Sequence, residues 1–208
     1  MGAAVAVIDS GSGNLRSVER ALIAAGAKPL VTSDPDLVAQ ADRIVVPGQG
    51  AFGDCVRNLR SRGLDEAIAQ AIASGKPYFG ICLGLQILFE SSEEGSKSED
   101  GEAAGLGLLK GHVKRFDPKV GKVPHMGWNS VVKTHEYHVL NGIDDGTYFY
   151  FIHSYYAAPD DDACVVLRCD YGGPFVAAVQ QDNIFACQFH PEKSQGAGLR
   201  LLANFMAQ

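Results

Sequence analysis

The sequence predicts an α/β fold with a mixed, largely parallel central sheet and helices on both of its faces. In the first half of the chain, short apolar runs alternate with stretches of helical periodicity. These runs are continuously apolar, which is typical of parallel strands buried on both faces. The second half consists mainly of strand-like runs and predicts an extension of the same sheet.

The first half supplies the strands and helices of the parallel part. An apolar run at residues 5–9 predicts the first strand, and Leu15, Val18 and Leu22 recur at helical spacing until Gly26 ends that helix. Further strands are predicted at residues 28–32, 44–46 and 78–81, and further helices at 35–40, 51–59, 64–73 and 83–90.

The second half predicts strands at residues 113–116, 130–133, 148–155, 164–171, 175–180 and 184–189, and a last helix at 198–206. The turn at residues 181–183 makes the last two strands a hairpin. Residues 91–102 form a polar, acidic tract with no periodicity, for which we expect a solvated, mobile loop.

Length and charge limit the class of protein. A chain of 208 residues fits a single domain, 1–208, that buries about 70% of its extended surface and needs no covalent crosslinks. Its net charge of −6 argues against binding to nucleic acid or to anionic lipid. No stretch approaches the roughly 20 apolar residues of a membrane span, and the N-terminus lacks the basic lead of a signal peptide. We therefore expect a cytoplasmic protein.

No metal or cofactor is predicted. The five cysteines are an odd number without a Cys-x-x-Cys pair, which fits neither a disulfide framework nor a zinc site. His135 and His138 lie in a polar stretch without a third ligand nearby. The glycine cluster at residues 10–14 lacks the complete dinucleotide-binding motif, and no Walker lysine is present.

The strongest local motif is Gly-x-Cys-x-Gly, formed by Gly80, Cys82 and Gly84 between a predicted strand and helix. This is the cysteine form of a nucleophile elbow, whose turn is too tight for side chains at the flanking positions. The elbow places the thiol at a helix N-terminus, which favours a thiolate, and leaves the N–H of Leu83 free for an oxyanion. The alternative is an ordinary strand–helix turn with an inert cysteine.

A cysteine nucleophile needs a base, and the base needs an orienting partner. His190 is the best candidate among six histidines, because it follows the apolar strand at residues 184–189. Glu192 stands two positions later, where it can fold back onto the imidazole ring. We expect both residues at the carboxyl edge of the sheet that carries Cys82. The alternative for this segment is a surface turn.

Together these segments resemble the class I glutamine amidotransferases, which use a Cys-His-Glu triad. Residues 80–86 are similar to the family's nucleophile segment, 47–50 to its oxyanion segment and 190–192 to the end of its triad. Within the family, residues 9–18, 124–129, 150–155 and 190–195 look like the glutaminase subunits of imidazole glycerol phosphate synthases. The resemblance leaves only the acidic tract uncovered and implies a flavodoxin-like fold.

The resemblance implies a glutaminase that acts through a glutamyl thioester. It implies that Cys82 attacks the side-chain amide of glutamine, His190 carries the proton to the leaving ammonia, and Glu192 orients His190. It also implies two further sets of residues. The oxyanion set is Gly48, Gln49, Gly50 and Leu83, and the glutamine-binding set is Gln86, Ser154 and Tyr155.

The resemblance also implies a heterodimer with a separate, barrel-shaped cyclase that consumes the ammonia in histidine biosynthesis. The implied partner surface is Asn14, Met126, Trp128, Asn129, Tyr150 and Lys193. Trp128 is the single tryptophan, expected in a loop; an indole is usually a core residue, but its large contact area also suits an interface.

Three rival functions remain open at this point. The chain could serve a different synthase, act alone as a cysteine hydrolase or peptidase, or be a non-catalytic binding module. Two positions depart from the family's pattern: Ser10 replaces an expected tyrosine at the partner rim, and Gln49 replaces a small apolar residue. If Gln49 acts through its backbone N–H, its side chain should matter little.

Overall fold

The computed structural model describes residues 3–11, 13–95 and 103–208. Its main feature is a nine-stranded sheet in the order β2-β1-β3-β4-β13-β12-β11-β8-β9. The parallel strands are β1 (Ala4–Ile8), β2 (Lys28–Thr32), β3 (Arg43–Gly48), β4 (Tyr78–Cys82) and β13 (Ile184–Cys187). The antiparallel strands are β12 (Pro174–Gln181), β11 (Val165–Asp170), β8 (His125–Lys133) and β9 (Tyr148–His153). The predicted mixed sheet is confirmed.

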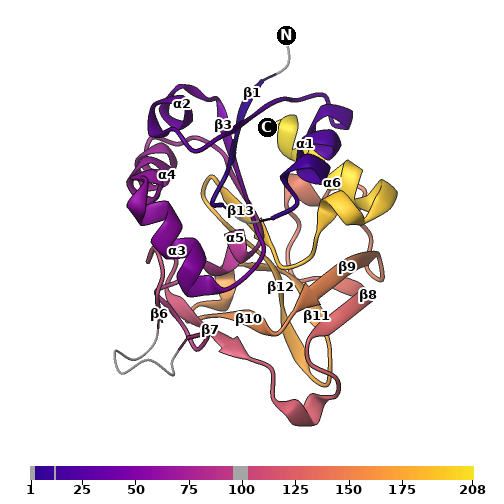
Figure 1. Ribbon diagram of the computed structural model, residues 1–208. Helices are drawn as coiled ribbons and strands as arrows, with labels where there is room; N and C mark the ends of the chain where they lie inside the picture. The colour runs from indigo at the N-terminus through magenta and orange to yellow at the C-terminus, as the bar shows by residue number, and fades with distance from the viewer. Residues whose placement is uncertain (1–2, 12, 96–102) are drawn as a thin grey trace.

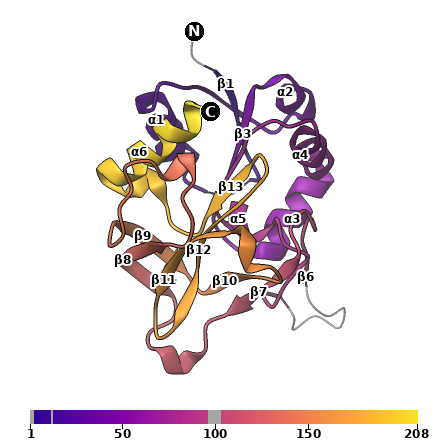
Figure 2. The same ribbon diagram turned by 180° about the vertical axis from the view of Figure 1, so that it is seen from behind.

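Helices cover both faces of the parallel part, as predicted (Figures 1 and 2). One face carries α2 (Pro35–Gln40), α3 (Phe52–Ser61) and α4 (Leu64–Ala73), and the other carries α1 (Leu15–Ala24) and α6 (Gln195–Met206). Short 3-10 helices lie between strands or before α6 in the described residues: η1 (Pro118–Val120), η2 (His138–Leu140), η3 (Asp162–Cys164) and η4 (Pro191–Lys193). In the described part of the chain, no helix combines the length and apolar character needed to cross a membrane.

Both faces of the parallel strands are buried, which explains their continuously apolar sequences. In β1, Val5 and Val7 join the core beneath α1 and α6, whereas Ala6 and Ile8 join the core beneath α2–α4. Successive side chains of β1 therefore pack into two different hydrophobic cores, one on each face of the sheet.

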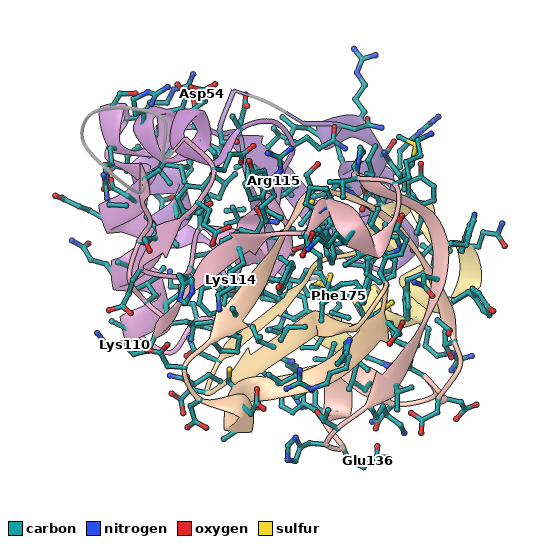
Figure 3. The ribbon with its side chains drawn as sticks, turned by 90° about the horizontal axis from the view of Figure 1, so that it is seen from below. Asp54, Lys110, Lys114, Arg115, Glu136 and Phe175 are labelled. Atoms are coloured by element: carbon teal, nitrogen blue, oxygen red, sulfur yellow. The ribbon has the colours of Figure 1, made fainter. Side chains whose placement is uncertain are left out.

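The second half of the chain differs from the prediction, because it forms a second sheet as well as extending the first. This four-stranded sheet contains β10 (Tyr155–Pro159), β7 (Gly111–Arg115), β5 (Ser91–Ser92) and β6 (Ala103–Ala104). Figure 3 shows Lys110, Lys114 and Arg115 along and just before β7, and Phe175 of β12 in the interior. The acidic tract thus begins in a strand and not in a loop, while residues 96–102 lie outside the described residues.

Three local predictions are also corrected. The helix expected at residues 83–90 is the single turn α5 (Leu83–Gln86), because backbone N–H groups of Leu106 and Leu108 bond the carbonyls of Ile87 and Leu88. The loop expected around Trp128 is instead part of strand β8, which is paired with β9. The run at residues 148–155 divides at Ser154, so that β9 and β10 belong to different sheets.

Candidate active site

The carboxyl ends of three adjacent parallel strands bring the predicted residues together. Gly48 at the end of β3 is in register with Cys82 at the end of β4, and β13 on the other side of β4 leads to His190. Figure 1 shows α5, which follows Cys82, beside these strand ends. The expectation that Cys82, His190 and Glu192 lie at one edge of the sheet agrees with this arrangement.

The turn at Cys82 is strained and very tight. Cys82 has φ 54° and ψ −102°, a positive-φ backbone conformation that a residue other than glycine adopts at a cost of about 1–3 kcal/mol. A Cβ atom at Gly84 would lie 1.9 Å from the carbonyl oxygen of Val46, and one at Gly80 would lie 2.5 Å from the carbonyl oxygen of Gly84. These contacts meet the demand that an elbow makes on its flanking positions.

His190 and Glu192 form a buried pair. Nδ1 of His190 lies 2.8 Å from Oε1 of Glu192, and both side chains are 2% exposed. Burial opposes protonation of the ring, but the negative charge of Cys82 and the Glu192 carboxylate bonded to Nδ1 outweigh burial and raise the pKa of His190 to about 10. The site therefore favours an imidazolium between a sulfur and a carboxylate.

Cys82 and His190 border a pocket of about 370 Å³, a size that suits a small metabolite. Of the predicted oxyanion, substrate and partner residues, seven line it: Gln49, Gly50, Leu83, Gln86, Ser154, Tyr155 and Lys193. Gly48 and Glu192 lie behind the pocket wall. The pocket thus gathers segments from both sheets around Cys82 and His190.

A chain of side-chain amides connects the pocket wall to the sulfur. Nε2 of Gln86 donates to the carbonyl oxygen of Tyr155 at 2.9 Å and to Oε1 of Gln188 at 3.0 Å. Nε2 of Gln188 in turn lies 3.5 Å from Sγ of Cys82. The sequence prediction missed Gln188, because within an apolar strand sequence it has no motif of its own.

Two buried histidines form a second chain that ends at the same carbonyl. Nδ1 of His153 lies 2.8 Å from the Tyr155 oxygen, and its Nε2 lies 3.0 Å from Nδ1 of His125. Nδ2 of Asn129 approaches the other nitrogen of His125 at 3.3 Å. Burial lowers the pKa of His153 to about 3 and that of His125 to about 4. Both rings are therefore neutral, and the Tyr155 oxygen assigns their protons to Nδ1.

Glu94 is a pocket residue that the sequence prediction missed. It lies in the acidic tract, where a run of charges gives no sign that one carboxylate differs from the others. Its Oε2 accepts a hydrogen bond from the backbone N–H of Phe52 at 2.7 Å, which places it at the start of α3. Burial, with a contribution from Asp54, raises the pKa of Glu94.

The residues expected at the partner surface do not all behave alike. Met126 and Trp128 are 60% and 46% exposed, so the core interpretation of the tryptophan is wrong. Trp128 meets Tyr150 edge to face, and the ammonium of Lys193 lies 5.7 Å from the Tyr150 ring centre. Asn129 instead uses its amide within the chain, since it also donates to the carbonyl oxygen of Asp170.

Two further expectations about the site differ from its geometry. The one-turn length of α5 leaves only a small helix dipole at Cys82, so the predicted dipole effect is weaker than expected. Asn14 is exposed and caps α1, whereas Ser10 is fully buried and therefore not at a surface rim. All five cysteines are free thiols, and the described residues contain no cluster that could hold a metal ion.

Comparison with known proteins identifies the family. The model of the glutamine amidotransferase class-I family matches residues 6–208. The chain therefore belongs to the class I glutamine amidotransferases. Within this class its relatives include imidazole glycerol phosphate synthase subunit HisH of Rhodopirellula baltica, 51% identical over 97% of this chain and 96% of that protein. The same subunit of Aromatoleum aromaticum is 52% identical over 98% of this chain and 97% of its own. At this identity over the full length, the chain belongs to the HisH branch of the class.

Solved structures agree on the fold. A crystal structure of glutamine amidotransferase superposes with a TM-score of 0.76 at 20% identity, covering 98% of this chain and 99% of that one. PurLQS from Thermotoga maritima gives a TM-score of 0.74 at 21% identity, covering 100% and 98% of the two chains. At such low identity these likenesses establish the fold alone.

Proposed function

We propose that this chain is the glutaminase subunit of an imidazole glycerol phosphate synthase, which hydrolyses glutamine and delivers ammonia to a cyclase subunit. The observation that carries the proposal is the arrangement of Cys82, His190 and Glu192. A strained cysteine and a buried histidine border one metabolite-sized pocket, and a carboxylate behind the pocket wall is bonded to that histidine. The relatives named imidazole glycerol phosphate synthase subunit HisH support the choice of this synthase.

In the proposed mechanism, the thiolate of Cys82 attacks the side-chain amide carbon of glutamine. His190 gives its proton to the nitrogen as the C–N bond breaks, so ammonia leaves and a glutamyl thioester remains. Water then attacks the thioester while His190 removes its proton, and the electron pair of the C–S bond returns to sulfur. Glu192 holds the ring through Nδ1, which leaves Nε2 for these proton transfers.

The tetrahedral intermediate carries an oxyanion that needs backbone donors. The N–H of Leu83 follows Cys82 at the first position of α5, where it has no partner within the helix. Gln49 and Gly50 border the pocket from the end of β3, with Gly48 directly behind them. We assign the binding of the oxyanion to these four residues.

The remaining pocket walls suit the amino acid end of glutamine. Ser154 and Tyr155 present backbone groups where β9 passes into β10, and Gln86 is held against the Tyr155 carbonyl. Glu94 places a carboxylate in the same pocket, which complements the α-ammonium of the substrate. These contacts bind the part of the substrate that does not react.

Partner docking completes the proposal. Ammonia released into water is protonated and loses its nucleophilicity, so it has to pass directly into a second protein. The exposed Met126 and Trp128, with Tyr150 and Lys193, supply an aromatic and cationic surface typical of interface anchors. Lys193 also lines the pocket, so this surface and the pocket are continuous.

The test is to mix the chain with the cyclase and its nucleotide ligand and to measure glutamate release and cyclised product. We expect hydrolysis that depends on the complex, and its loss in Cys82→Ser. Full hydrolysis by the isolated chain would favour the stand-alone hydrolase instead. Ammonia production that persists in Cys82→Ser would refute the assigned nucleophile.

A further inference from the structure

The side chain of Gln188 is fully buried and ends at the nucleophile. It follows β13, two residues before His190, and its backbone N–H is bonded to the carbonyl oxygen of Ala177. Its Nε2 lies 3.5 Å from Sγ of Cys82, within hydrogen-bond range for sulfur. A buried amide keeps such a position only when its polar groups have partners.

The direction of this hydrogen bond follows from the backbone. The Tyr155 carbonyl oxygen can only accept, so the group of Gln86 that lies 2.9 Å from it has to be the amide nitrogen. The same nitrogen lies 3.0 Å from Gln188, whose facing atom is therefore the oxygen. The other end of the Gln188 amide is then an N–H donor aimed at the sulfur.

We propose that Gln188 is a catalytic residue that donates a hydrogen bond to the sulfur of Cys82, fixing the side chain and stabilising its anionic form. The inference deepens the proposed function and rests on it, because the reaction of the Cys82 sulfur is the one assigned there. Sequence motifs point to Cys82, His190 and Glu192, whereas the role of Gln188 follows from the contact geometry.

The N–H donor of Gln188 acts in the hydrolysis of the thioester as well as in its formation. In the thioester the sulfur is neutral and accepts hydrogen bonds weakly. When water cleaves the C–S bond, the electron pair returns to the sulfur, and the N–H of Gln188 stabilises the leaving thiolate together with the imidazolium of His190. A charge-assisted bond of this kind is stronger than one between neutral groups.

The test uses alkylation of Cys82 by iodoacetamide as a function of pH, followed on the isolated peptide by mass spectrometry. Peptide resolution is needed because Cys164 is only half-buried. We expect Gln188→Leu to slow alkylation at neutral pH by about tenfold or more and to move its midpoint to higher pH. In the reconstituted complex, the same variant should accumulate acyl-enzyme, which a purely structural role would not produce.

Gln188→Glu provides a second variant, in case the leucine side chain disturbs the fold. It preserves the shape and the acceptor for Gln86, but turns a carboxylate oxygen toward the sulfur, so it should slow alkylation further. The matched control is Gln180→Leu, which removes a glutamine bonded to the carbonyl oxygen of Asp182 in the neighbouring hairpin. The control should alkylate like the unmodified chain.

Unchanged alkylation profiles in folded Gln188→Leu and Gln188→Glu would overturn the inference, whatever the glutaminase activity is. If the two variants alter the alkylation profile but the complex of the unmodified chain releases no glutamate, the contact with the sulfur is upheld and the proposed function is refuted. Thermal unfolding of each variant verifies that the compared proteins are folded.

Discussion

Gly84 packs so close to the end of β3 that its missing side chain is a structural requirement. A Cβ atom at this position would fall 1.9 Å from a backbone oxygen, a conflict that no rotamer change can relieve. We expect Gly84→Ala to lower the free energy of unfolding by about 3 kcal/mol or more, measured by urea denaturation. The matched control is Gly196→Ala in α6, where nothing lies within 4 Å, and it should be neutral or slightly stabilising.

Equal unfolding midpoints for these two variants would contradict the tight packing of the elbow. The comparison separates the helix propensity of alanine, which is the same in both, from steric conflict, which only Gly84 has.

Glu192 supports the charged form of His190 and fixes its tautomer. Removing its charge in Glu192→Gln should lower the pKa of His190 from its raised value and leave the ring free to turn. We expect kcat to fall about 100-fold or more, with the alkaline limb of the kcat profile moving to lower pH. Glu136→Gln, which removes an exposed carboxylate paired with Lys133, is the control and should keep the parent profile. If Glu192→Gln keeps the kcat profile of the parent chain, Glu192 does not orient His190 or support its charge.

Prediction from sequence works at the residue scale where chemistry imposes a local pattern. Gly80, Cys82 and Gly84 could be found because one tight turn needs all three. Gln188 and Glu94 could not, because their partners lie 106 and 42 positions away along the chain, and no local pattern records such contacts.

At the scale of elements, the β8–β9 pair encloses the His125–His153 chain, whose stability depends on pH. Folding lowers both pKa values below the ordinary 6.5, so the unfolded chain binds more protons between about pH 4 and 6.5. The free energy of unfolding should therefore fall on acidification from pH 7 to 5, by about 1–2 kcal/mol per histidine. His190 has a raised pKa, so its contribution to stability is constant below pH 6.5 and declines steadily as the pH rises from 6.5 to about 10.

Urea unfolding at several pH values measures this slope. His125→Phe preserves the stacking with Tyr171 and removes one titrating group, so its stability should depend less steeply on pH between 5 and 6.5. His138→Gln, at an exposed position, is the control and should keep the parent slope. Identical slopes in the parent and in His125→Phe would exclude the histidine chain as the source.

Element boundaries were predictable where a helix or strand is defined by its own sequence, as in α2, α4 and β2. Boundaries could not be predicted where hydrogen bonds to distant segments determine the end of an element. Segment 105–109 takes the carbonyls after Gln86 and ends α5 early, although the apolar spacing continues. The division at Ser154 is equally invisible, because β9 and β10 share one uninterrupted strand-like sequence.

At the scale of the whole molecule, the nine-stranded sheet has two different edges. Trp128 lies on β8 beside one edge, and Leu30, 50% exposed, lies on the edge strand β2 at the other. We expect Trp128→Ala to weaken binding to the cyclase by about 30-fold, measured by calorimetry, because buried tryptophans dominate interface energies. Leu30→Ala should bind like the parent chain. If both variants bind equally well, Trp128 is outside the interface.

The mixed sheet with helices on two faces was predictable because alternating apolar runs and helical periods determine the class of layer architecture. The second sheet was not, because two of its strands, β5 and β6, have two residues each and carry no recognisable period.

The carbonyl of Tyr155 serves both buried chains, one running through Gln86 to the sulfur and the other through His153 toward β8. No codon change can convert a main-chain oxygen into a donor. The direction of the hydrogen bonds in both chains is therefore set by a main-chain oxygen. Any residue at position 155 that keeps the backbone in place preserves that direction.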